Sequence, residues 1–186
     1  MNARRILALT FVAALLAVGL WKVTWRSKLP GANVVALPLS SGSFALGADI
    51  PKKFTCDGDD VSPQLSWFAP AGIQSFALIA EDPDAPIGTF THWVIFDLPA
   101  TATALPEGVS KVAQLPDGSR QGENDFDKIG YSGPCPPPGM AHRYFFKLYV
   151  LDRKLGLRAG SSKREVEKAM DGHILARTEY FGKYKR

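Results

Sequence analysis

Short apolar or alternating runs, separated by loops rich in proline and glycine, form the main pattern of this 186-residue chain. Four of these runs, at 43–47, 75–82, 91–99 and 143–152, are rich in β-branched and aromatic residues and are bounded by Pro, Gly or Asp. This composition and these boundaries are typical of β-strands. The stretch 173–184 has a similar composition, so we expect it to form a further strand.

A single helix is predicted after Ser162. Glu165 stands three residues further on, which matches a capping box, and Gly172 provides a stop signal. Several strands with one helix predict a mainly-β fold, an antiparallel β-sandwich with few peripheral helices. The long connections 100–130 and 131–142 interrupt it, and loops of this length in a compact domain commonly carry function.

The amino-terminal region differs from the rest of the chain. Residues 6–21 contain no charge and would reach about 24 Å as a helix, or about 30 Å if the next few residues are included. We expect 1–28 to be an uncleaved membrane anchor, with a cleaved signal peptide as the alternative. Residues 29–42 are then a linker, and 43–186 form the folded domain.

The formal net charge of +4 comes from this amino-terminal region. Residues 1–28 hold five of the 22 basic residues and no acidic one, so the remainder has 17 basic against 18 acidic residues. A nucleic-acid-binding protein with a broad cationic face is therefore not expected. The alternative is a local patch, because residues 128–186 contain 13 basic and 5 acidic residues.

The two cysteines, Cys56 and Cys135, lie in separate turn-rich stretches. An even number behind a secretory segment permits one disulfide in an oxidising compartment, and two separate thiols are the alternative. The absence of a C-x-x-C spacing argues against a zinc site. We expect the domain to face the periplasm or the exterior, either tethered to the membrane or released after cleavage.

Three carboxylates gather where one predicted strand ends, in the sequence Glu-Asp-Pro-Asp-Ala-Pro. Asp82 and Asp84 are separated by a proline, and Pro86 follows, so the backbone is restricted to extended conformations. Like charges at such spacing are unfavourable unless a cation or a donor lies among them. We therefore treat the two aspartates as candidate site residues, with an Asx-turn that merely ends the strand as the alternative.

Two of the three histidines also stand at strand entrances. His92 begins one predicted strand shortly after the aspartates, and His142 begins another. Between them lies the loop 130–139, whose amide at Gly133 is a candidate for an anion-binding concavity. Imidazoles donate to phosphate and carboxylates accept from an amine, so we expect a small anionic or zwitterionic ligand.

Catalytic motifs are not found. The sequence lacks a G-x-S-x-G elbow, a phosphate-binding loop and a dinucleotide fingerprint. No H-x-H or H-x-x-x-H spacing supports a metal site, although a triad of His92, His142 and an aspartate leaves a metal-dependent hydrolase as a further alternative. We expect a protein that is not an enzyme and that holds neither cofactor nor metal.

Together these segments resemble the phosphatidylethanolamine-binding protein family, in its bacterial branch described as Raf kinase inhibitor-like proteins. The resemblance rests on two segments that match the family's two signature regions, DPDAP followed by HWVIFDLP, and GYSGPCPPPGMAHRYFFKLYVLD. FTCDGDDVSPQLSW and QGENDFDKIGY resemble the same branch, so the similarity extends from about residue 43 to residue 184.

The resemblance implies an antiparallel sandwich with a small pocket at one end that holds phosphate, phosphorylated headgroups or similar anions. Some family members inhibit kinases or proteases by protein contact, which implies a protein target as the alternative function; a homodimer is also open. The implied ligand-binding residues are Asp82, Asp84, Pro86, His92, His142 and Tyr144, and the implied disulfide joins Cys56 and Cys135. The chain departs from the branch at Asp127, where a glycine is usual and where the extra charge is expected to weaken phosphate binding.

Overall fold

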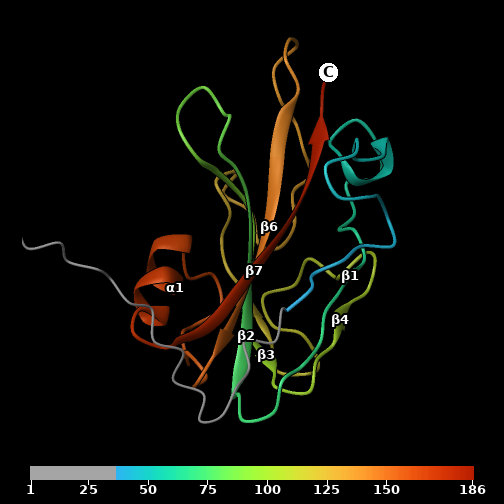
Figure 1. Cartoon of the computed structure of the whole chain (residues 1–186). Helices are drawn as coiled ribbons and strands as arrows, with labels where there is room; N and C mark the ends of the chain where they lie inside the picture. Colours follow the sequence, from blue (N-terminus) through green and yellow to red (C-terminus); the bar gives the residue numbers. More distant parts are fainter. Residues whose placement is uncertain (1–36) are drawn as a thin grey trace, which may run out of the picture.

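The computed structural model describes residues 37–186, and Figure 1 labels most of its strands and helices. In chain order they are η1 (Lys52–Phe54), β1 (Leu65–Ser66), β2 (Ser75–Asp82), β3 (Phe90–Pro99), β4 (Ala104–Leu105), β5 (Arg120–Gln121), β6 (His142–Leu151), α1 (Lys163–Met170) and β7 (Ile174–Tyr184). The long strands match the predicted runs closely, which confirms a mainly-β fold.

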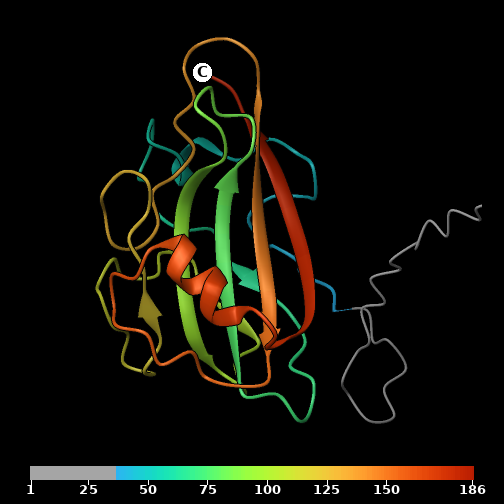
Figure 2. The same ribbon diagram turned by 90° about the vertical axis from the view of Figure 1, so that its left-hand side faces the viewer.

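All strand pairs within the two sheets are antiparallel. The larger sheet has five strands in the order β5-β3-β2-β6-β7, and β1 pairs with β4 in a separate two-stranded sheet. Strand β2 is central, since it pairs with β3 on one side and β6 on the other. Figure 2 shows the long strands of this sheet side by side, with α1 in front of one face.

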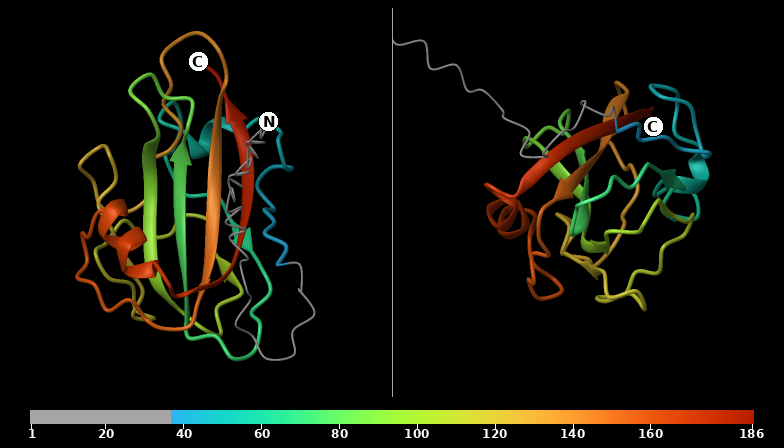
Figure 3. Two further views of the ribbon diagram at one scale, coloured as in Figure 1. Left: turned by 60° about the vertical axis from the view of Figure 1, so that its left-hand side comes forward. Right: turned by 60° about the horizontal axis from the view of Figure 1, so that its bottom comes forward.

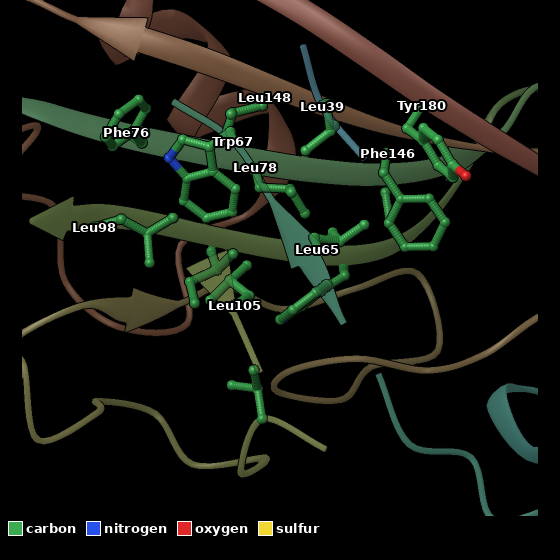
Figure 4. Close-up of a cluster of buried hydrophobic side chains, with 14 of the residues drawn as sticks. Leu39, Leu65, Trp67, Phe76, Leu78, Leu98, Leu105, Phe146, Leu148 and Tyr180 are labelled. Atoms are coloured by element: carbon green, nitrogen blue, oxygen red, sulfur yellow. The ribbon is translucent and has the colours of Figure 1, made fainter. Parts of the chain in front are cut away.

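Both faces of the large sheet are buried, and β2 shows this directly. Phe76 and Leu78 point into a core shared with the small sheet, whereas Ala77 and Ile79 point into a second core beneath α1. This follows from the two-residue period of a strand. Figure 4 shows the first core, where side chains from the small sheet pack against those of β2, β3 and β6. The second layer is thus a short ribbon with loops rather than a full sheet.

Helix α1 has the predicted cap. The Ser162 side chain accepts from the Glu165 amide, and the Glu165 carboxylate accepts from the Ser162 amide, which completes a capping box. Gly172 lies just beyond the helix with φ of 76°, a left-handed conformation that suits glycine. Val166 and Met170 are buried in the second core, so the helix closes the far face of the sheet.

The predicted strand at 43–47 is wrong. These residues form bends and a turn, in which Ala48 donates to the carbonyl of Ala45 and Gly47 donates to the edge of β7 at Phe181. Gly47 has φ of 72°, which interrupts an extended conformation. Phe44 is nevertheless buried in the first core, so the apolar residues of this segment indicate burial rather than a β-strand.

The expected anchor at 1–28 lies outside the described residues, as does most of the expected linker. The last linker residues are described, and they pack on the domain, because Leu37 and Leu39 are buried and Ser40 pairs with Ser66. Among residues 37–186, no helix is both long enough and apolar enough to cross a membrane.

A buried carboxylate ties β2 to the helix and to β6. The Glu81 side chain is 7% exposed and forms ion pairs with Lys147 on β6 and with Lys163 on α1, the latter at 2.9 Å. Burial alone would raise the pKa of Glu81, but the hydrogen bonds from the two lysines outweigh it and hold that pKa below its usual value.

We therefore predict that Glu81→Gln lowers the free energy of unfolding by about 2 to 3 kcal/mol at pH 7, because two half-buried lysines lose their counter-charge. A depressed carboxyl pKa stabilises the fold above the unfolded-state pKa of 4.5 and ceases to do so as pH falls through the folded-state value. Urea unfolding at pH 7 and pH 3 measures this. The gap between wild type and variant should be smaller at pH 3 than at pH 7, whereas the exposed control Glu123→Gln should change little at either pH. Equal stability of Glu81→Gln and wild type at pH 7 would contradict the prediction.

Candidate ligand pocket

A cavity of about 280 Å³ opens where β2 ends and where β3 and β6 begin. Figures 2 and 3 show that the loop after β2 and the loop before β6 rise at this same end of the sheet, with α1 toward the other end. The residues lining the cavity are Asp82, Ala85, Pro86, Ile87, Phe90, His92, Phe126, Cys135, Pro136, Pro137, His142 and Tyr144. The structure thus brings together five of the predicted ligand-binding residues: Asp82, Pro86, His92, His142 and Tyr144.

Asp82 and His142 form a buried pair at the pocket. Asp82 Oδ2 lies 2.7 Å from His142 Nδ1, and the side chains are 4% and 11% exposed. The other carboxylate oxygen accepts from the Asp84 amide at 2.8 Å. Because a carboxylate accepts the hydrogen bond, Nδ1 of His142 carries the proton, and Nε2 is the nitrogen left for a ligand.

His92 lies on β3, on the other side of β2 from His142, and a backbone carbonyl orients its ring. Its Nδ1 lies 2.7 Å from the carbonyl oxygen of Ser132, so this nitrogen also donates and Nε2 is again left for a ligand. Aromatic rings surround the imidazole, with centroids 5.1 Å away at Tyr144 and 5.4 Å away at Phe126. Burial lowers the pKa of His92 and outweighs the opposing effect of the Ser132 carbonyl and the Asp82 charge.

Tyr144 supplies an unused donor. The residue is 2% exposed, and its hydroxyl has no hydrogen-bond partner among the described residues. Burial, then the charge of Asp82, and then the nearness of that carboxylate as an acceptor raise the pKa of Tyr144 far above its ordinary value, so the hydroxyl keeps its proton. The hydroxyl thus lies near Asp82, but no hydrogen bond of normal geometry joins the two side chains. An unpaired buried hydroxyl costs free energy, and in a pocket it marks the place where a ligand acceptor fits.

Asp84 does not line the cavity, contrary to the role expected for it. Its carboxylate accepts from Nε and Nη2 of Arg143 at 2.8 and 2.6 Å, and from the Arg143 amide at 2.9 Å. These hydrogen bonds lower the pKa of Asp84 to about 2. The Asp84 side chain lies outside the cavity lining because its guanidinium partner follows His142 on β6, where alternate residues point to opposite faces. Asp84 thus holds the loop after β2 to the start of β6.

Gly133 is also outside the cavity. Its amide, a candidate donor to an anion, instead donates to Asp60 Oδ1 at 2.6 Å. A Cβ at this position would lie 2.2 Å from the carbonyl oxygen of Phe54, so glycine is needed for the close approach of two backbones. Gly133 therefore has a structural role, whereas the loop 130–139, to which it belongs, still forms one wall of the pocket.

The disulfide between Cys56 and Cys135 is present. It joins the turn after η1 to the proline-rich loop before β6. Cys135 and the two prolines after it line the cavity, so the bridge lies in the pocket wall. The family resemblance implied this pairing but not the position of the disulfide in the pocket wall.

Several apolar wall residues were not predicted. Ile87 and Phe90 come from the loop after β2 and the start of β3, and Phe126 comes from a loop whose Asp125 carboxylate accepts from the Thr91 amide at 2.6 Å. The position of Phe90 two residues before His92, on the same face of the strand, was the available signal. Asp127 is exposed and is not part of the lining, and its φ of 57° is a left-handed conformation that suits the glycine expected there from the family resemblance.

The charge of the pocket depends on its imidazoles. With both histidines neutral, the lining carries only the negative charge of Asp82, and both Nε2 atoms are acceptors. With both protonated, each Nε2 donates and the lining becomes net positive. Proton uptake by both imidazoles would therefore change the sign of the charge on the lining from negative to positive. Within residues 37–186, no group of three or more His, Cys, Asp or Glu side chains is placed to hold a metal ion.

The sequence profile described as "Phosphatidylethanolamine-binding protein" matches residues 40–185. A protein of Aquifex aeolicus named UPF0098 protein is 49% identical over 162 residues, which is 86% of this chain and 94% of that protein. A UPF0098 protein of Methanothermobacter thermautotrophicus is 52% identical over 149 residues, 80% of this chain and 98% of its own length. These names state no enzymatic activity.

Solved structures agree with this match. The crystal structure of Escherichia coli YbcL, described as a member of the mammalian phosphatidylethanolamine-binding protein family, superposes with a TM-score of 0.76 at 32% identity over 82% of this chain and 99% of that one. A homolog of the same family from Chlamydia trachomatis gives a TM-score of 0.74 at 39% identity, over 81% and 98% of the two chains.

We predict that His92, in the absence of bound anions, is neutral at pH 7 with its proton on Nδ1 and a pKa below 6.5. Nitrogen-15 NMR of the imidazole distinguishes the two tautomers and follows the titration. A proton on Nε2, or a pKa above 6.5 without ligand, would show that the Ser132 carbonyl does not orient this ring.

Proposed function

Because the chain belongs to the phosphatidylethanolamine-binding protein family, we propose that its pocket binds a small phosphate-bearing or carboxylate anion without transforming it. The observation that carries this proposal is the Tyr144 hydroxyl, a buried donor with no partner among the described residues, in a lining shared with two imidazoles. Three donors converging on one cavity fit the oxygens of a phosphate group.

Protonation of His92 and His142 completes the site in this proposal. Each imidazole already donates from Nδ1, to Ser132 and to Asp82, so each can donate to a ligand only from a protonated Nε2. An anion supplies the charge that favours both imidazolium forms, and Asp82 provides a partner for the imidazolium of His142. Binding and proton uptake are therefore coupled.

The apolar wall indicates which anions fit. Ile87, Phe90 and Phe126 surround the opening, and the cavity of about 280 Å³ has more room than a phosphate ion needs. A phosphomonoester with a small organic group would place its phosphate among the donors and its carbon atoms against the wall. This is the chemistry of a phosphorylated headgroup.

The lining supports binding rather than catalysis. It contains no serine or threonine, and its one cysteine, Cys135, is held in a disulfide. The pocket therefore offers no serine, threonine or free cysteine for covalent catalysis. The disulfide also supports the proposal that the domain functions in an oxidising compartment, tethered to the membrane or released from it outside the cytoplasm.

The proposal predicts that anion affinity falls as pH rises. Sulfate is a suitable probe because its charge is constant between pH 6 and pH 8, and its affinity should fall about tenfold or more over that range as imidazolium is lost. Calorimetry in buffers of different ionisation enthalpy should show net proton uptake at neutral pH. His142→Ala should abolish binding, whereas His173→Ala, which removes a histidine at the far end of β7, should not. Equal or tighter binding of wild type at pH 8 would contradict histidine-mediated capture.

A second prediction concerns Tyr144→Phe. Loss of a hydrogen bond to a charged ligand should weaken inorganic phosphate binding about tenfold or more. Thermal stability without ligand should be equal or slightly higher, because the hydroxyl is buried and unpartnered in the described structure. Tyr149→Phe, on the opposite face of the sheet, is the matched control. If both variants bind phosphate like wild type, the Tyr144 hydroxyl does not contact the anion.

A further inference from the structure

One wall of the pocket is built from a segment that cannot be held by its own backbone donors. Cys135 is followed by Pro136, Pro137 and Pro138, and proline has no N–H. The cavity is lined by Cys135 and the first two of these prolines. Among the described residues, none of the three prolines takes part in a hydrogen bond with another residue. Pro136 is buried, whereas Pro137 and Pro138 are exposed. The position of this wall therefore depends on packing at Pro136 and on ties at its two ends.

The ties differ in strength. Just before the wall, Gly133 donates to Asp60 at 2.6 Å, and Pro134 accepts from the Cys56 amide at 3.1 Å. Beyond it, Gly139 donates to the carbonyl of Arg186 at a long 3.4 Å. The disulfide is the one covalent tie, and it holds the first residue of the wall itself.

The disulfide is accessible and has a cation beside it. Cys56 is exposed and Cys135 is half-buried, so a small dithiol can reach the bridge. Nη1 of Arg186 lies 3.9 Å from Cys135 Sγ. A thiol beside a guanidinium ionises more readily than a free one, so reduction would place thiolate character at Cys135.

We propose that the Cys56–Cys135 disulfide positions the wall of the anion pocket, so that the thiol–disulfide state of this pair controls anion affinity. This inference rests on the proposed function. Reduction lowers anion affinity for two reasons. It releases Pro136 and Pro137 from their covalent tie, and thiolate character at Cys135 brings negative charge to a wall that faces an anion. The oxidised protein is the tight-binding form.

The redox step is an ordinary two-electron exchange. A dithiol transfers two electrons and two protons to the bridge, the S–S bond breaks, and Cys56 and Cys135 become thiols while the dithiol becomes a cyclic disulfide. Linkage then requires a reciprocal effect. If the oxidised form binds phosphate more tightly, phosphate must stabilise the bridge against reduction by the same factor.

The experiment measures both sides of this linkage on the full chain. Inorganic phosphate affinity is determined by calorimetry for the oxidised protein and for the protein reduced with excess dithiothreitol, with circular dichroism to confirm that both are folded. We expect affinity to fall at least about tenfold on reduction. The reduction potential of the bridge is then measured in dithiothreitol redox buffers with saturating phosphate or with sodium chloride at equal ionic strength. A tenfold affinity ratio corresponds to a potential about 30 mV more negative with phosphate.

Two variants keep the test independent of reducing agents and of unfolding. Cys56→Ser leaves the Cys135 thiol and should bind phosphate weakly, and the double variant with Cys135→Ser should recover only the part of the loss that is due to the thiolate. In His142→Ala, phosphate should no longer shift the potential. If the oxidised protein fails to bind phosphate, the proposed function and this inference both fail. If oxidised and reduced forms bind equally and phosphate leaves the potential unchanged, this inference is overturned while the proposed function stands.

Discussion

The pairing of β2 with both β3 and β6 is the constraint on which the pocket depends. Both β3 and β6 run antiparallel to β2, so the end of β2 meets the beginnings of the other two at one end of the sheet. Asp82 is the last residue of β2, His142 the first of β6, and His92 the third of β3. Groups separated by up to 60 positions in the chain therefore line one cavity. The 2.7 Å contact between Asp82 and His142 joins the end of β2 directly to the start of β6.

The same strand arrangement determines the role of each polar side chain at the pocket. Asp82 orients one imidazole, and a backbone carbonyl orients the other, which leaves the outer nitrogen of each ring for a ligand. Asp84, two residues further, turns away and is neutralised by Arg143. The pocket therefore holds a single carboxylate against two bases, and its net charge is decided by the protons it takes up. We propose that anion binding at such a site is accompanied by uptake of protons from the solvent.

Much of this could be predicted from local sequence. The strands at 75–82 and 143–152, and the helix after Ser162, were identifiable because their signals are local: β-branched and aromatic residues bounded by Pro, Gly or Asp for the strands, and a capping box for the helix. Residues 43–47 misled because apolar residues in a loop can be buried without forming a strand. Gly133 and Asp84 are residue types that suit a binding site, but they hydrogen-bond to Asp60 and Arg143 instead. Only the tertiary arrangement reveals these partners. The apolar wall and the place of the disulfide in it could not be predicted, since they depend on which loops meet.

A crystal structure of the protein with phosphoethanolamine at pH 6 would show whether an anion lies among Tyr144, His92 and His142, as we propose. We expect phosphate oxygens within hydrogen-bond distance of the Tyr144 hydroxyl and of Nε2 of both histidines, with the organic group toward Phe90 and Phe126. A phosphate bound elsewhere on the domain, or a pocket in which these three atoms do not contact it, would overturn the proposed function.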